Sequence, residues 1–156
     1  MKKILLALVM LTFAVTVRPG GAQQLVLSLV DGGNVIEFSL QDLDEMPQES
    51  FSTRTTWTEG VVTFSGVSLS HVLKSVGESG SLLRMVALND YAVEMPISEV
   101  GETYPIIATR MNGETMKVRD KGPYWIVYPY DLDPDYRTET SYARSIWQLK
   151  TLSVIE

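Results

Sequence analysis

Short segments of strand-forming residues, separated by turn signals, run along most of this chain and constrain its fold more than any other feature. Three pairs of segments meet at residues that favour hairpins: Asp31-Gly32-Gly33-Asn34, Asn89-Asp90 and Asn112-Gly113. Glycine and asparagine tolerate the positive φ angles of tight turns, and Asn-Gly is the dipeptide best suited to a two-residue type I′ turn. The strands predicted from this pattern are Leu25–Val30, Val35–Leu40, Phe51–Thr56, Val61–Phe64, Leu82–Leu88, Tyr91–Met95, Ile106–Met111, Glu114–Val118, Tyr124–Tyr128 and Trp147–Ile155.

Two further segments have the periodicity of helices. Over Leu69–Val76 the apolar residues recur at i, i+3, i+4 and i+7, with Ser68 as the predicted N-cap and Gly77 as the C-terminal stop. A shorter helix is expected after Ser39, whose side chain can form a capping box with Asp42. Because the sequence has no repeats or internal linkers, strands and helices together predict a single α+β domain.

Aromatic residues crowd the predicted strand Tyr124–Tyr128. Alternate residues of a strand face opposite sides of the sheet, so Tyr124 and Trp125 begin two different sets. One set is expected in the core, and the other could line a cleft; the sequence leaves open which is which. The polar, tyrosine-bearing residues 131–145 that follow are expected to mix loop with a short helix.

The first 22 residues have the pattern of a secretory signal peptide. Lys2 and Lys3 supply a positive start, Ile4–Val17 is an apolar run of fourteen residues, and small residues precede a predicted cut before Gln23. Fourteen residues are too few for a helix of about 20 that spans a bilayer. We therefore expect residues 23–156 to form an exported, periplasmic domain.

Charge and composition exclude several classes of function. Without Lys2, Lys3 and Arg18, ten basic residues remain against nineteen acidic ones, a net charge of −9, so nucleic acid is not an expected partner. The chain has no cysteine and a single histidine, His71. It therefore has no thiolate nucleophile, no disulfide and no cluster of histidines for a metal, and its stability must come from its core.

Several segments, in their order and spacing, resemble the oxidoreductase molybdopterin-binding domain, the fold of sulfite oxidase. The resemblance covers nearly all of residues 23–156. It implies a compact, strand-rich α+β domain around mixed sheets that binds the pterin of the molybdenum cofactor. The segments that carry it are FSLQDLDEMPQ, WTEG, TFSGVSLSHVL, ALNDYAVEMP, ATRMNGETMKVRDKGPYWIVYP and WQLKTLSV.

Trp57 stands where the enzymes of this family have their metal-binding cysteine. An indole cannot replace a thiolate as a metal ligand, so the resemblance implies a pterin site without molybdenum. Short exported chains of this kind resemble the periplasmic pterin-binding proteins of the PruR type. That resemblance implies a sensor subunit, and not an enzyme, which binds a reduced pterin non-covalently. Its implied partner is a membrane-bound cyclic-di-GMP enzyme, a diguanylate cyclase or phosphodiesterase, or a sensor kinase.

Two alternatives stay open. The chain could be a molybdopterin-dependent redox subunit in which the metal is held without a protein thiolate. It could also be an interaction domain whose pocket is filled by its own aromatic side chains.

A planar pterin needs an aromatic face for stacking and polar groups for the N–H groups of its edge. Trp57 is the candidate face, although many tryptophans are core anchors. Asn89, Asp90 and Tyr91 place an amide, a carboxylate and a phenol at one turn, where Asp90 can accept two hydrogen bonds. Turns favour Asn and Asp for conformational reasons as well.

Basic residues near the Asn112-Gly113 turn are the other candidates. Arg110 and Arg119 would approach one another if their strands pair in the expected register, and both could donate charge-assisted hydrogen bonds to a ligand carbonyl or phosphate. Lys121 and Gly122 complete the candidate site in the following loop, where Gly122 allows close approach of the backbone to a ligand.

Overall fold

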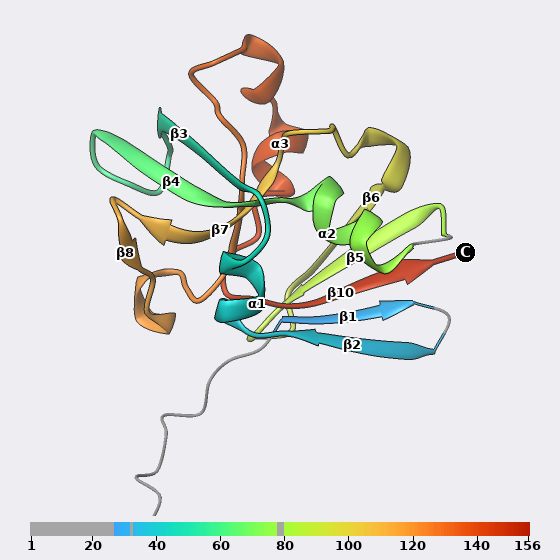
Figure 1. Cartoon of the computed structure of the whole chain (residues 1–156). Helices are drawn as coiled ribbons and strands as arrows, with labels where there is room; N and C mark the ends of the chain where they lie inside the picture. The colour runs from blue at the N-terminus through green and yellow to red at the C-terminus, as the bar shows by residue number, and fades with distance from the viewer. Residues whose placement is uncertain (1–26, 32, 78–79) are drawn as a thin grey trace, which may run out of the picture.

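The computed structural model describes residues 27–31, 33–77 and 80–156 of the chain (Figure 1). The predicted signal peptide, residues 1–22, lies outside the described residues. Across the described ranges we find no helix with both the length and the apolarity needed to cross a membrane.

The first of two five-stranded sheets has the order β2-β1-β10-β5-β6. The hairpins β1–β2 and β5–β6 are antiparallel, as their turn residues predict, and β10 pairs with β5 in the same sense. Among the described strands of this sheet, β1 and β10 are the parallel pair, and most of the chain lies between them, as a parallel pair requires a long connection. The bounds are β1 Leu27–Asp31, β2 Asn34–Phe38, β5 Leu82–Ala87, β6 Ala92–Pro96 and β10 Leu149–Ile155.

The second sheet has the order β3-β4-β7-β8, and β9 also pairs with β7. The β7–β8 hairpin turns at Asn112 (φ 53°) and Gly113 (φ 83°), which confirms the predicted turn with two positive φ angles. The bounds are β3 Gln48–Arg54, β4 Val61–Ser68, β7 Ile106–Met111, β8 Glu114–Thr115 and β9 Trp125–Val127.

Short helices connect the sheets. In Figure 1 α1 and α2 lie between the two sheets, and α1 contacts β2 of the first sheet and β4 of the second. The third helix, α3, follows β9 and leads into β10, within the stretch expected to mix loop and helix. The bounds are α1 Leu40–Asp44, α2 Leu69–Val76 and α3 Glu139–Ala143, with 3₁₀ turns η1 Ile97–Glu99, η2 Val118–Asp120 and η3 Pro134–Tyr136.

The predicted caps of α1 and α2 differ in outcome. Ser39 and Asp42 form the full capping box, which holds the pKa of the Asp42 carboxyl below its usual value. Gly77 ends α2 in the left-handed conformation, as predicted (φ 68°). Ser68 stands at the N-cap, but its hydroxyl donates to the carbonyl of Glu102 at 2.7 Å instead of capping the helix.

Several predicted strand limits were wrong. β3 begins at Gln48 and ends at Arg54, not at Phe51 and Thr56, and β4 continues to Ser68 and not only to Phe64, because the two strands pair from Gln48–Val67 to Arg54–Val61. β2 ends at Phe38, because Ser39 begins the cap of α1. β8 ends at Thr115 and not at Val118, because the chain enters η2. β10 begins at Leu149 and not at Trp147, because Gln148 has a left-handed backbone (φ 52°) whose N–H bonds to the carbonyl of Lys121 at 3.0 Å.

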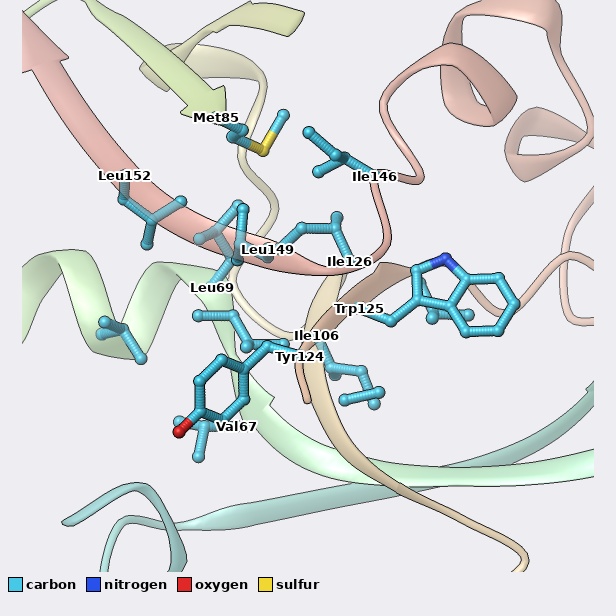
Figure 2. Close-up of a cluster of buried hydrophobic side chains, with 14 of the residues drawn as sticks. Val67, Leu69, Met85, Ile106, Tyr124, Trp125, Ile126, Ile146, Leu149 and Leu152 are labelled. Carbon is cyan, nitrogen blue, oxygen red and sulfur yellow. The ribbon is translucent and has the colours of Figure 1, made fainter. Parts of the chain in front are cut away.

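The core lies between the sheets, and Figure 2 shows the side chains that both sheets contribute to it. Tyr124 and Trp125 leave the chain on opposite sides in this view, yet every residue from 124 to 130 is buried. Both sets of alternating side chains around β9 therefore belong to the interior, which settles the question that the sequence left open.

The Ser39 cap gives a direct test of the α1 boundary. Replacement of Ser39 by Ala removes the acceptor for the Asp42 N–H, so we expect the free energy of unfolding to fall by about 1 kcal/mol. Urea denaturation measures this loss. The exposed Ser98 supplies the matched Ser→Ala control; an equal loss in both variants would contradict the capping role.

Candidate functional site

A cavity of about 340 Å³ opens beside the aromatic part of the core. Three segments that are distant in sequence form its wall: the β3–β4 loop, the end of β5 with its following turn, and the chain from α3 to the start of β10. The lining residues are Trp57, Ala87, Asn89, Tyr91, Tyr142, Ala143, Ser145, Ile146 and Trp147.

Trp57 joins this wall to a group of stacked and edge-packed rings that we call the aromatic cluster. Its ring centroid lies 5.6 to 6.4 Å from those of four other rings, in edge-to-face arrangements. The loop is shaped locally: the Thr55 hydroxyl accepts the Trp57 N–H at 3.0 Å, and Gly60 takes a positive φ of 65°. Trp57 is half-buried. The cluster consists of Trp57, Trp125, Tyr130, Tyr142 and Trp147.

Ser145 is a buried hydrogen-bond centre behind the cavity wall. Its hydroxyl donates to the carbonyl of Ser141 at 2.7 Å, so the Tyr130 hydroxyl must be the donor in its 2.5 Å bond to Ser145 Oγ. The Trp125 indole N–H donates to the Ser145 carbonyl at 3.2 Å. Burial raises the pKa of Tyr130 above its usual value, which keeps this donor protonated. The network fixes the segment that carries Tyr142 and Trp147.

The Asn89-Asp90-Tyr91 turn reaches the cavity with two of its three predicted residues. Asn89 and Tyr91 line the wall, and the Asn89 side-chain oxygen accepts the Tyr91 N–H at 3.2 Å. Asp90 is exposed, does not line the cavity and has a left-handed backbone (φ 64°). The preference of turns for Asp therefore explains the presence of Asp90 at this position, and a ligand contact is not needed to explain it.

The two predicted arginines lie outside the cavity wall. Arg110 makes a bidentate ion pair with Asp44 of α1, with distances of 2.5 and 2.8 Å. This pair holds the pKa of the Asp44 carboxyl below its usual value. Arg119 stands on η2, exposed, with its Nε 3.5 Å from Asp120. Arg110 pairs in register with Thr115, so the hairpin does not align it with Arg119.

The loop residues Lys121 and Gly122 have different surroundings. The Lys121 ammonium lies 5.9 Å from the ring centroids of both Trp125 and Trp147, and Lys121 is not among the residues that line the cavity. Gly122 is buried, and a Cβ on it would lie 2.0 Å from the carbonyl oxygen of Met116. Its close backbone approach is thus to Met116, not to the cavity.

Several wall residues were missed by the sequence analysis. Tyr142 was expected in a polar stretch that mixes loop with a short helix, and Trp147 at the start of a strand. Their aromatic side chains were the one feature of the sequence that could have suggested a place in the wall. Ser145 and Ile146 carry no such signal. Within the described residues there is no group of three or more His, Cys, Asp or Glu side chains that could hold a metal ion.

The Arg110–Asp44 pair leads to a prediction about pH. Both side chains stay about 30% exposed, so we expect Asp44→Asn to lower the free energy of unfolding by only about 1 kcal/mol at pH 7. Because the folded pKa of Asp44 is lowered, this contribution exists above the unfolded value of about 3.9 and is lost as the pH falls through the folded pKa. Denaturant unfolding at pH 7 and near pH 3 should therefore show the two proteins converging in acid. A constant difference would contradict this assignment.

Comparison with known proteins bears on the fold. No protein-family profile and no curated protein sequence matches the chain. Among solved structures that match is the crystal structure of the sulfane dehydrogenase SoxCD from Paracoccus pantotrophus, with a TM-score of 0.65 and 18% sequence identity. The match covers 83% of this chain and 38% of that chain, so the chain spans about two fifths of the length of its structural neighbour. This similarity supports a sulfite oxidase-like fold for the strand-rich α+β domain.

Proposed function

We propose that this chain is an exported, non-catalytic protein that binds a reduced pterin non-covalently in the cavity beside Trp57. The observation that carries the proposal is that Trp57 lines an aromatic cavity. The sequence resemblance implies that the related enzymes have their metal-binding cysteine at this position. A ring in that position offers a stacking surface and no metal ligand.

The residues of the wall fit a pterin. A volume of about 340 Å³ lies at the lower end of the ~300–1,000 Å³ that small-molecule sites occupy. Trp57, Tyr142 and Trp147 provide aromatic surface, and the Asn89 amide provides a polar group for the ring edge. The lining contains no thiolate, imidazole or carboxylate, so these walls supply no ligand for a metal.

In this proposal the protein acts as a sensor subunit. A bound pterin would order the Asn89–Tyr91 turn, which lines the cavity, and a partner that prefers the ordered form would then bind with a different affinity. The partner we propose is the periplasmic part of a membrane-bound enzyme of cyclic-di-GMP metabolism or of a sensor kinase. A basic face on that partner would complement the acidic exterior of this chain.

The structural similarity to a dehydrogenase supports a second candidate, a molybdopterin-dependent redox subunit. The edge packing of Trp57 against four rings supports a third, an interaction domain that fills its pocket with its own side chains. One titration separates the three. Residues 23–156 are titrated with tetrahydro- and dihydropterins, read by tryptophan fluorescence and calorimetry, after expression in a host that makes molybdopterin, with molybdenum assayed on the same sample.

Saturable pterin binding without molybdenum supports the proposed function. Near-stoichiometric molybdenum in the protein as isolated would move the assignment to the redox subunit. Absence of any pterin binding would leave the interaction domain. In the native host, cyclic-di-GMP levels should respond to loss of this protein if the proposed partner is correct, and an unchanged level would contradict that part of the proposal.

Tyr91 provides a variant with little structural cost. It lines the cavity, and 53% of its surface is exposed, so Tyr91→Ala should change the free energy of unfolding by less than about 1 kcal/mol. We expect the same variant to weaken pterin binding by roughly three- to tenfold, because it removes an aromatic wall. Leu132→Ala is the matched control, since Leu132 is 66% exposed and does not line the cavity. Equal affinities of both variants for pterin would place the ligand elsewhere.

Trp57→Ala separates the ligand-facing role from a core role. Because Trp57 is half-buried, the loss of unfolding free energy should stay below the roughly 3 to 5 kcal/mol of a fully buried tryptophan. We expect a loss of pterin affinity of tenfold or more in a protein that still unfolds cooperatively. A large loss of stability with unchanged affinity in the folded fraction would assign Trp57 to the core alone. Thermal melting and calorimetry on the same preparation measure both quantities.

A further inference from the structure

We infer that the mouth of the cavity is the surface on which a protein partner docks, and that this partner presents an apolar contact beside lysine or arginine side chains. The inference rests on the proposed function, because it names the surface through which the proposed sensor would act. Two observations carry it. Aromatic side chains around the cavity stay in contact with solvent, and each of the three wall segments bears an exposed carboxylate that makes no ion pair in the described part of the chain.

We call the lining residues that stay in contact with solvent the cavity rim. Tyr91 is the clearest member, because it lines the cavity while 53% of its surface is exposed. The remaining lining residues, Ala87, Ser145 and Ile146, are buried. A ligand held against these walls would therefore leave part of its own surface exposed, where a partner contacts it. The rim consists of Trp57, Asn89, Tyr91, Tyr142, Ala143 and Trp147.

The aromatic composition of the rim is typical of a protein interface. Tyrosine and tryptophan are enriched at the centres of interfaces, because they bury a large area and lose little conformational freedom. Single exposed apolar residues, such as Val35 and Leu132, are common on protein surfaces and need no partner. The aromatic residues of the rim differ from these, since they all line one opening and so form one surface.

The wall segments carry negative charges beside the rim. Asp90 lies in the turn after β5, Glu59 lies in the β3–β4 loop, and Glu139 is the first residue of α3. All three residues are exposed, and none of them takes part in an ion pair within the described ranges. Unpaired carboxylates around an apolar centre complement a partner whose own apolar contact is bordered by basic side chains.

The cations beside the wall are already engaged. Arg144, in the segment between α3 and β10, donates to Glu99 at 2.7 Å. The Lys121 ammonium lies 5.9 Å from the ring centroids of Trp125 and Trp147, within the range of cation–π attraction. The three carboxylates, and not these two cations, are therefore the charges that the wall segments offer to a partner.

The turn that carries Asp90 has a fixed base. The Ala87 N–H donates to the Tyr91 carbonyl at 2.9 Å, and the Asp90 N–H donates to the Ala87 carbonyl at 3.0 Å. Asp90 itself has a left-handed backbone and does not line the cavity, whereas its neighbour Tyr91 does. One short turn therefore holds an aromatic contact for the ligand next to a charge for the partner, and a charge held in place loses little freedom on binding.

This arrangement explains how a partner would distinguish the two states of the sensor. With a ligand bound, the mouth offers a filled apolar surface that includes part of the ligand. Without a ligand, the same partner would have to cover an open cavity of about 340 Å³. The partner therefore has a different affinity for the two states through contact with the ligand itself, and no large movement of the domain is required.

The test is a photocrosslink in living cells of the native host. The photoreactive residue benzoylphenylalanine replaces Glu59, which is exposed and does not line the cavity. After irradiation, mass spectrometry identifies the protein joined to it. We expect the exported region of a membrane-bound protein, crosslinked at a segment that contains lysine or arginine. The same label at Val35, which is exposed on β2 at the opposite edge of the first sheet from β6, should not give this product.

Charge variants then test the carboxylates in the labelled protein. Asp90→Lys should lower the yield of the crosslink roughly three- to tenfold, because it sets like charges against each other across the interface. It should leave the affinity for dihydroneopterin within about twofold, because Asp90 lies outside the cavity wall. Asp90→Asn, which tolerates the same backbone conformation, should give a smaller loss in the same direction. Glu37→Lys is the matched control, since Glu37 is exposed on β2 and makes no ion pair in the described residues; it should change neither quantity.

The outcomes separate this inference from the proposed function. No crosslink from position 59, or the same product from positions 59 and 35, would overturn the docking surface, and saturable binding of dihydroneopterin to the same protein would leave the pterin site intact. A crosslink yield that is equal in Asp90→Lys and Glu37→Lys would overturn the complementarity to a basic partner. Failure of reduced pterins to bind the wild-type protein would overturn the proposed function itself. Melting curves of each variant establish that the comparison is made on folded protein.

Discussion

The burial of Trp125 is the interaction on which the rest of this structure depends. The residue lies in β9 and is fully buried. Its ring centroid lies 5.3 Å from that of Phe64 in β4, so it packs in the core of the second sheet. On its other side the same ring contacts Trp57 and Trp147, and its N–H binds the Ser145 carbonyl. One side chain therefore connects the sheet, the loop before β4 and the segment before β10. The loop before β4 and the segment before β10 form the cavity wall together with the end of β5 and the turn that follows it.

The charges of the domain are arranged away from that cavity. Arg110 forms an ion pair with Asp44 of α1, and Arg144 forms one with Glu99 of η1. Each pair joins two different parts of the fold. The wall consists of aromatic and aliphatic surface, the Asn89 amide, the phenols of Tyr91 and Tyr142, and the Ser145 hydroxyl, which is already hydrogen-bonded. A site of this composition is suited to hold a flat, polar-edged molecule by contact area.

Local sequence signals predicted the elements well wherever a turn or cap enforces them. Asn112-Gly113 and the Ser39 capping box formed as predicted, since both depend on residues within a few positions of each other. The errors at β8 and β10 have a different origin. Lys121 and Gln148 both have left-handed backbones, and the Gln148 N–H donates to the Lys121 carbonyl. These two residues are far apart in the sequence, so no local propensity encodes their contact. Among the site candidates, Trp57, Asn89 and Tyr91 reached the wall, whereas Arg110 found a partner in a helix 66 positions away.

The sequence by itself determined the strand-rich α+β class, the hairpins, the two helix caps that glycine and serine specify, and the absence of thiolate chemistry. These follow from residue type and short-range spacing. Only the tertiary structure decided that both faces of β9 are buried, that Tyr142 and Trp147 form a wall with Trp57, and that Arg110 pairs with Asp44 outside the cavity. The physical reason is that each of these depends on packing between segments far apart in the chain, where many alternative pairings satisfy the same local pattern.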